Sequence, residues 1–310
     1  ALRQLRTYFR ESPFDVIHAH SSKAGMLARL AAWQARNPAA RVYSPHAFAF
    51  TMEVAPWRRR LYLVLERLAG RITDLLVCTC DSERELATRH RIIAPSRAAV
   101  VRTGVDLRRF RPTGAGHRVR AELGLPRRHR IVGTVGAMVE QKGHDLLVAA
   151  APLVLREMPH TTFVLVGSGP LEDELRQAAS VLGLGRRMVF LGQREDVPEL
   201  LNAFDLFVMP SRWEGMPYAL VEAMAVGVPA LGSAIPGIVD LLRPGSTGWL
   251  TEPGSPEALA RAIITALTAE GQSAAMAAAG RELVMREHSC ERMLGTLAAL
   301  YERVVEDRRR

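Results

Sequence analysis

The chain has 310 residues, 48% of them hydrophobic, and a formal net charge of +9. This length predicts two domains, and the sequence contains no apolar run long enough for a membrane-spanning helix. The basic residues are scattered and aromatic residues make up only 6% of the chain. Stacking platforms for single strands are therefore not evident, and a nucleic-acid partner would rest on charge alone. Acidic ligands or an anionic membrane surface explain the charge without such platforms.

The cysteines and the N-terminal sequence bear on the compartment. Cys78, Cys80 and Cys290 make no disulfide framework, and Cys78 and Cys80 share one face of a predicted strand, where we expect buried free thiols. The first residues lack the layout of a signal peptide. We therefore expect a cytoplasmic protein, with the inner membrane surface as its alternative location. No cluster of metal ligands stands out, so neither a metal nor another cofactor is expected.

The first half of the chain predicts helices alternating with short apolar strands. Strands are expected near residues 15–19, 41–45, 74–80 and 98–102. Helices are expected over residues 1–11, from Ser22 onward, over 56–70 and over 81–90. Alternation of this kind is typical of an α/β fold with a parallel sheet.

Two of these helices begin with candidate capping residues. Ser21 or Ser22 can cap the second helix. Asp81 or Ser82 can cap the helix over 81–90, with Glu85 in the capping-box position.

The helix over residues 56–70, PWRRRLYLVLERLAG, is basic and amphipathic. Its expected role is packing, with the arginine stems lying along apolar surface and their charges in water. Contact with a membrane surface is the second interpretation.

Lysine is rare in this chain, because only Lys23 and Lys142 carry an ammonium among 41 basic residues. Both follow predicted strands, at turns into helices. Lys23 opposes the helix dipole in the first turn of its helix. It therefore faces an anion or an acceptor group, or it is a solvated surface lysine, and both interpretations stay open.

The second half follows a linker rich in Gly, Pro and charge, over residues 112–130. Strands are expected over residues 131–135, 162–166, 188–191, 205–210 and 228–233. Helices are expected after Lys142–Gly143, over 218–226, from Ser255, which caps its helix, and over 275–310.

The stretch from Asp205 to Leu231 organises this half. A buried strand leads through the turn SRWEG and Pro217 into the helix over 218–226, which Gly227 stops. The start of that helix offers unpaired N–H groups and a positive dipole end, which suit a phosphate. Glu214 and Glu222 can bind neutral hydroxyls beside it, or they are a solvated acid and a helix-dipole acid. Spacing alone leaves both interpretations open.

The motif EGMPYALVEAMA at 214–225, followed by GVP and by GSTGWL at 245–250, resembles the donor-site signature of glycosyltransferase family 4. The resemblance implies a GT-B fold, in which two Rossmann-like domains face each other across a cleft. The domains would cover residues 1–112 and 113–280, and a helix over 281–310 would cross back to the first domain. VIHAHSSKAG at 16–25 resembles the fourth-strand region of members that build cell-surface polysaccharides, so the first domain is expected to be incomplete and N-terminally truncated.

The resemblance also implies the activity, which is retaining transfer of a hexose-type sugar from a nucleotide-diphosphate sugar to a glycan or lipid-linked acceptor. Glu214 would orient the sugar, and His46 would face it from the other domain. Lys142 would bind the diphosphate and Lys23 would lie on the acceptor side. The implied donor-binding residues are Gly136, Lys142, Gly167, Arg194, Gly215, Met216, Pro217, Leu220 and Glu222.

The sequence departs from the family pattern at three positions. Ala47 stands where the family often has Gly, and Ala137 stands where it usually has Arg. Thr103 stands where the family usually has Asn. Ala137 removes one phosphate contact or leaves Lys142 to act alone. A non-catalytic nucleotide-sugar binding module is therefore one alternative. A GT-B-type nucleotide-sugar epimerase is another, against which EGMPYALVE argues.

Overall fold

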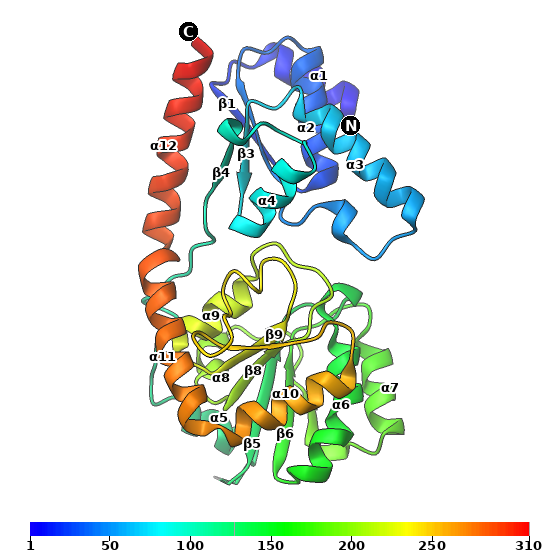
Figure 1. Cartoon of the computed structure of the whole chain (residues 1–310), viewed down its shortest axis with the longest axis vertical. Coiled ribbons are helices and arrows are strands. Elements are labelled where there is room, and N and C mark those ends of the chain that lie inside the picture. Colours follow the sequence, from blue (N-terminus) through cyan, green and yellow to red (C-terminus); the bar gives the residue numbers. More distant parts are fainter. Residues whose placement is uncertain (127, 310) are drawn as a thin grey trace. The chain divides into compact units, whose positions relative to one another are not determined.

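The computed structural model describes residues 1–126 and 128–309, which form two compact units (Figure 1). The first unit comprises residues 1–104, the short segment 213–216 and the chain from Cys290 onward. The second comprises residues 105–212 and 217–289. The domain boundaries expected at residues 112 and 280 stay predictions.

A four-stranded parallel sheet forms the centre of the first unit, in the order β1-β2-β3-β4. Its strands are β1 (Val16–His20), β2 (Ala40–Ser44), β3 (Leu75–Cys78) and β4 (Ala98–Val100). The helices are α1 (Leu2–Glu11), α2 (Ser22–Gln34), α3 (Pro56–Gly70), α4 (Asp81–Arg89) and α12 (Cys290–Arg309). All four predicted strands are confirmed.

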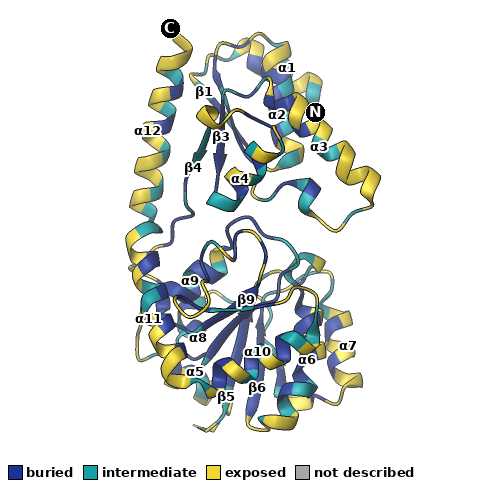
Figure 2. Ribbon diagram, in the orientation of Figure 1, coloured by how far each residue is buried: buried dark blue, intermediate teal, exposed yellow. Residues whose placement is uncertain are grey.

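The strands of this parallel sheet are largely buried, because helices or loops cover both of its faces (Figure 2). Every residue of β3 is buried, as in strands that lack a solvent face. On one face Leu300 and Val304 of α12 pack against β2 and β3. On the other, Tyr43 and Leu76 join a cluster with Phe48. Cys78 and Cys80 are buried free thiols, as expected.

Ser21 is the N-cap residue of α2, as predicted, but the cap of α4 differs from the prediction. Within the described residues, α2 and α4 make no side-chain cap bond, and their N-caps are Ser21 and Cys80. Glu83, rather than Glu85, is the acid of α4 whose carboxylate binds backbone N–H groups near the start of the helix. Its carboxylate accepts hydrogen bonds from Thr79 N (2.7 Å) and Ala47 N (2.8 Å). A carboxylate in this position ties together the loops that follow β2 and β3, which a capping pattern does not reveal.

The second unit contains a six-stranded parallel sheet in the order β10-β9-β8-β5-β6-β7. Its strands are β5 (Arg130–Val135), β6 (Thr161–Val166), β7 (Met188–Phe190), β8 (Leu206–Met209), β9 (Ala230–Ser233) and β10 (Trp249–Thr251). The chain builds outward from β5 first on one side and then on the other. The topological switch point therefore lies between β5 and β8, where open α/β sheets bind ligands at the carboxyl ends of the strands.

The helices of the second unit are α5 (Gly116–Glu122), α6 (His144–Glu157), α7 (Glu172–Val181), α8 (Val197–Leu201), α9 (Tyr218–Val226), α10 (Pro256–Thr268) and α11 (Glu270–Glu287). The Ser255 cap of α10 is confirmed, since its hydroxyl accepts from Ala258 N at 3.1 Å. The helix expected over 275–310 is interrupted. The backbone at His288 and Ser289 pairs instead with Val105, which ends α11 before α12 begins.

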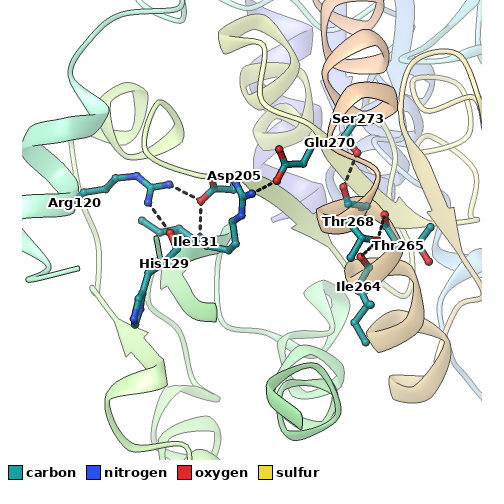
Figure 3. Close-up of polar contacts among 11 residues, drawn as sticks. Arg120, His129, Ile131, Asp205, Ile264, Thr265, Thr268, Glu270 and Ser273 are labelled. Atoms are coloured by element: carbon teal, nitrogen blue, oxygen red, sulfur yellow. Dashed lines mark hydrogen bonds and ion pairs between the residues drawn. The ribbon is translucent and has the colours of Figure 1, made fainter. Parts of the chain in front are cut away.

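An ion-pair network fixes β5 beside β8 at the end of the sheet opposite the switch point (Figure 3). Asp205 accepts a hydrogen bond from Ile131 N and ion-pairs with Arg120 and Arg130. Arg130 also pairs with Glu270. These contacts anchor the two central strands whose other ends carry the candidate site.

Candidate functional site

Three loops of the second unit interlock at the carboxyl ends of β5, β6 and β8. Gly167 has a φ of 130°, and a Cβ there would stand 2.0 Å from Gly136 O. Gly143 has a φ of 63°, and its Cβ would stand 2.1 Å from Pro210 O. Only glycine fits such approaches, so Gly143 and Gly167 allow the close loop packing, and Gly136 contributes the carbonyl that Gly167 approaches. The loops thereby bring their backbones together at the switch point.

Lys142 lies in this assembly, in the short turn Glu140–Lys142 that precedes α6. Its side-chain carbons lie 3.6–3.7 Å from where a Cβ on Gly136 would be. The stem therefore runs along the glycine that ends β5. This placement agrees with the turn expected from the sequence.

Arg212, which the sequence analysis missed, holds the Lys142 turn in place. Its N–H donates to Gln141 O (2.8 Å) and its guanidinium to Glu140 O (2.9 Å). The guanidinium also forms two hydrogen bonds with the Asp145 carboxylate, at 2.8 and 2.6 Å. Burial opposes ionisation of Asp145, but the bonds from Arg212 outweigh it and lower the pKa of that carboxyl. An Arg three residues after the end of β8 is the sequence signal that could have suggested this role.

The helix start predicted after β8 is confirmed, because α9 begins at Tyr218 with Pro217 as its N-cap. The predicted donor residues Met216, Pro217 and Leu220 are buried. Their side chains therefore belong to the protein interior, and what they can offer a ligand is backbone. Tyr218, by contrast, is 53% exposed.

Glu222 is half-buried on α9. Burial raises the pKa of its carboxyl, and the nearby positive charge of Arg109 lowers it in part. Within the described residues the carboxylate makes no hydrogen bond. A half-buried acid of this kind can accept a hydrogen bond from a ligand hydroxyl without giving up a protein partner.

Arg194, predicted beside the nucleobase, is already engaged. Its guanidinium pairs with Asp196 (2.8 Å) and with Glu122 (3.0 Å), and these bonds raise the pKa of Arg194 above its usual value. A role at the nucleobase stays a prediction, and it would compete with these ion pairs.

In the first unit, His46 and Ala47 follow β2 in the left-handed region, with φ values of 52° and 83°. For residues other than glycine this conformation costs about 1–2 kcal/mol each. The bond from Ala47 N to Glu83 helps to hold the backbone there. The strained geometry explains why glycine is common in the family at position 47. Strain of this kind concentrates at functional sites.

His20, at the end of β1, pairs with His46, which the sequence analysis did not foresee. His20 Nδ1 and His46 Nε2 are 2.8 Å apart, and the two rings stack with centroids 5.1 Å apart. Both residues are exposed at one edge, but partial desolvation of the rings lowers the pKa of both imidazoles, and His46 lowers that of His20 further. Both side chains are therefore neutral at neutral pH and share one hydrogen bond.

His18 lies beside His20, with ring centroids 4.2 Å apart. Its ring contacts Ser44 Oγ at 2.9 Å and Tyr301 Oη of α12 at 2.5 Å. Burial, together with the neighbouring imidazoles, lowers the pKa of His18 to about 3. This ring is a neutral, half-buried support beside the His20–His46 pair.

The predicted residues Glu214 and His46 come together, because the segment 213–216 belongs to the first unit. A Cβ on Gly215 would stand only 2.9 Å from the carbonyl carbon of His46, and Cys80 Sγ lies 3.8 Å from Gly215 O. Glu214 itself is buried. The close packing explains the glycine of the EGMP motif. Lys23 is exposed in the first turn of α2.

No group of three or more His, Cys, Asp or Glu side chains is arranged to hold a metal ion in residues 1–126 and 128–309. No helix in these ranges has the length and hydropathy of a membrane span.

The fold and these loops define a GT-B α/β protein, as predicted. Residues 117–283 match the family model described as glycosyl transferases group 1, and residues 1–104 match a glycosyl transferase 4-like domain. The chain therefore belongs to the group 1 glycosyl transferases, and its class is that of a transferase enzyme.

Two curated relatives show how similar the chain is in sequence to named glycosyltransferases. The chain is 32% identical over 85% of its length to an Escherichia coli UDP-Gal:alpha-D-GlcNAc-diphosphoundecaprenol alpha-1,3-galactosyltransferase, of which it covers 69%. It is 31% identical over 88% of its length to the D-inositol 3-phosphate glycosyltransferase of Rhodococcus jostii, of which it covers 64%. The chain thus spans about two thirds of these proteins.

Solved structures give the same picture. Anabaena HepE, crystallised with UDP and glucose, superposes with a TM-score of 0.83 at 25% identity, covering 97% of this chain and 80% of HepE. Sucrose-phosphate synthase from Thermosynechococcus elongatus gives a TM-score of 0.84 at 25% identity, covering 99% and 77%.

Proposed function

We propose that this chain transfers a hexose-type sugar from a nucleotide-diphosphate sugar to a glycan or lipid-linked acceptor, with retention at the anomeric carbon. The observation that carries the proposal is the glycine-lined junction at the switch point of the second unit, into which the turn carrying Lys142 is clamped by Arg212. The E. coli relative uses UDP-galactose and a diphosphoundecaprenol-linked sugar by its name, and HepE was solved with UDP. These names support the donor and acceptor classes.

The leaving diphosphate gains negative charge as the bond from its oxygen to the sugar breaks. The Lys142 ammonium and the N–H groups at the start of α9 would stabilise that charge electrostatically. Each charge-assisted hydrogen bond contributes on the order of 1.5–3 kcal/mol. Neither a metal nor another cofactor is part of the proposal.

The carboxylates and imidazoles would handle hydroxyl groups. Glu222 would accept hydrogen bonds from the ribose diol, and Glu214 would orient the sugar. The neutral His46 would face the reacting sugar, held by its hydrogen bond to His20. A neutral imidazole can both donate to and accept from sugar hydroxyls, which suits an uncharged substrate. Lys23 would lie on the acceptor side.

A lipid-linked acceptor would place the reaction at a membrane surface, with the protein in the cytoplasm in peripheral contact with the inner membrane. The E. coli relative supports this part, since its named acceptor is attached to undecaprenol. A nucleic-acid partner is not part of the proposal.

Calorimetric titration with UDP-, GDP- and ADP-sugars tests donor binding. Lys142→Ala is expected to weaken donor affinity by about tenfold or more, because one charge-assisted contact is lost. The matched control is Arg156→Ala, which removes one exposed positive charge from the far end of α6 and is expected to leave affinity unchanged. Equal affinity in the wild type and Lys142→Ala would remove Lys142 from the donor site. Donor binding with neither transfer nor hydrolysis would favour a binding module.

A further inference from the structure

Helix α3 is fixed by contacts along one face. Glu66 on that face accepts hydrogen bonds from Tyr43 Oη (2.9 Å) and Arg29 (3.2 Å). A Cβ on Gly70 would stand 1.8 Å from Ile92 O, so the end of the helix touches the neighbouring loop directly. These contacts determine which face of α3 looks outward.

One face of α3 packs on the core through Tyr62 and Leu63, as predicted, but much of the helix is exposed (Figure 2). The exposed face carries an apolar stripe, which the packing role alone does not explain. Its members are Trp57, Leu61, Val64, Leu65 and Leu68, with exposed fractions of 62%, 45%, 47%, 39% and 51%. At about 100° per residue they fall within an arc about 100° wide on the side opposite Glu66. A monomeric protein rarely leaves a contiguous apolar surface of this kind uncovered.

Arginines flank this stripe on both sides. Arg58 lies on one side and Arg60 and Arg67 on the other, and all three are exposed. The one acid in α3 is Glu66, which is turned inward and 3% exposed. The outward face therefore combines apolar side chains with positive charge that no acid of the helix balances.

We propose that this face of α3 docks the first unit onto an anionic lipid bilayer. The stripe would enter the boundary between headgroups and acyl chains, with the flanking arginines on lipid phosphates. Trp57, at the start of the helix, suits the headgroup level. A second copy of the chain fits less well, since symmetric pairing of α3 would bring the arginine flanks together without an acid between them. The inference deepens the proposed lipid-linked acceptor, on which its biological meaning rests.

Co-sedimentation with vesicles tests the proposal separately from sugar transfer. The wild-type chain is expected to bind phosphatidylcholine vesicles containing phosphatidylglycerol and to release them at high salt. Leu61→Ser/Val64→Ser/Leu68→Ser is expected to lower the partition coefficient by about tenfold or more. Arg60→Gln is expected to lower it by about fivefold. The matched control is Val181→Ser/Leu182→Ser, which changes exposed apolar residues of the second unit.

Each outcome has a defined meaning. Circular dichroism melting curves that match the wild type show that the variants are folded, because all substituted side chains are exposed. Loss of binding in the α3 variants with full binding in the control supports the proposal. Absence of wild-type binding, or equal binding by the α3 variants, overturns it. A concentration-dependent dimer that the α3 variants abolish would assign the face to a second copy instead. Calorimetric donor binding, measured on the same samples, reports on the proposed function independently.

Discussion

The two units carry different kinds of residues at the carboxyl ends of their parallel strands. In the second unit, glycines at the switch point bring three loops together and a clamped turn presents Lys142. In the first unit, the same end of the sheet carries His20 and His46, whose pKa values are lowered so that both are neutral. A cation and bare backbone suit a diphosphate, whereas neutral imidazoles suit hydroxyl groups. The same kind of sheet can therefore carry either binding chemistry, according to the residues that follow its strands.

The largest expected effect concerns the segment 213–216, which carries Glu214. Glu214→Ala is expected to lower turnover by about 100-fold or more with little change in donor affinity, because a preorganised contact to the sugar is lost. Steady-state kinetics with the preferred donor would measure it. Glu282→Ala, at an exposed position on α11, is the control, and near-normal turnover of Glu214→Ala would remove Glu214 from the site.

A second prediction concerns the clamp on the Lys142 turn. Arg212→Ala is expected to raise the KM for donor by about tenfold, since two charge-assisted bonds to Asp145 are lost. Asp145→Asn should have a similar effect, and the double variant should be no worse than Arg212→Ala alone. Fully additive effects would show that the pair does not act as a unit. Thermal melting separates loss of stability from loss of positioning.

The half-buried imidazole of His18 in the first unit predicts a pH dependence of folding. The pKa of His18 is about 3 in the folded protein against about 6.5 unfolded. Below about pH 6.5 the His18 imidazole binds a proton in the unfolded chain but stays unprotonated in the folded protein. Stability should therefore be full above this pH and fall as pH decreases toward 3, by at most about 1.4 kcal/mol per pH unit for this group. Urea unfolding across this range should show a flatter profile for His18→Asn, and an unchanged profile would contradict the assignment.

The smallest expected effect is a change in stability that tests the backbone strain at Ala47, beside His46. Ala47→Gly is expected to stabilise the fold by about 0.5–1 kcal/mol, because glycine accepts a φ of 83° without steric cost. Ala24→Gly, at an exposed position of α2, should instead destabilise the fold by about 1 kcal/mol. Chemical denaturation measures both. Destabilisation by Ala47→Gly would mean that the alanine methyl group contributes more through packing than it costs in strain.

Local pattern predicted most of the elements. The bounds of α3 and α9 agree with the sequence analysis residue for residue, because amphipathic periodicity, Pro at the start and Gly at the end act within a few turns of chain. All strands of the described residues except β10 were predicted for the same reason, as short apolar runs between turn residues. The roles assigned to Glu214, His46 and Lys142 came from motif resemblance, and they stay predictions.

Only the tertiary structure brought together residues far apart in sequence. His20 meets His46 because β1 and β2 are paired in parallel, and Arg212 meets Asp145 because β8 lies beside β5. The outward turn of the α3 stripe was likewise decided by Glu66, whose buried bonds to Tyr43 and Arg29 fix the rotation of the helix. The sequence by itself determined which helices and strands have an apolar face and a polar face, since periodicity is a local property. Packing determined where each face pointed, since a face is chosen by contacts that form only when the whole chain has folded.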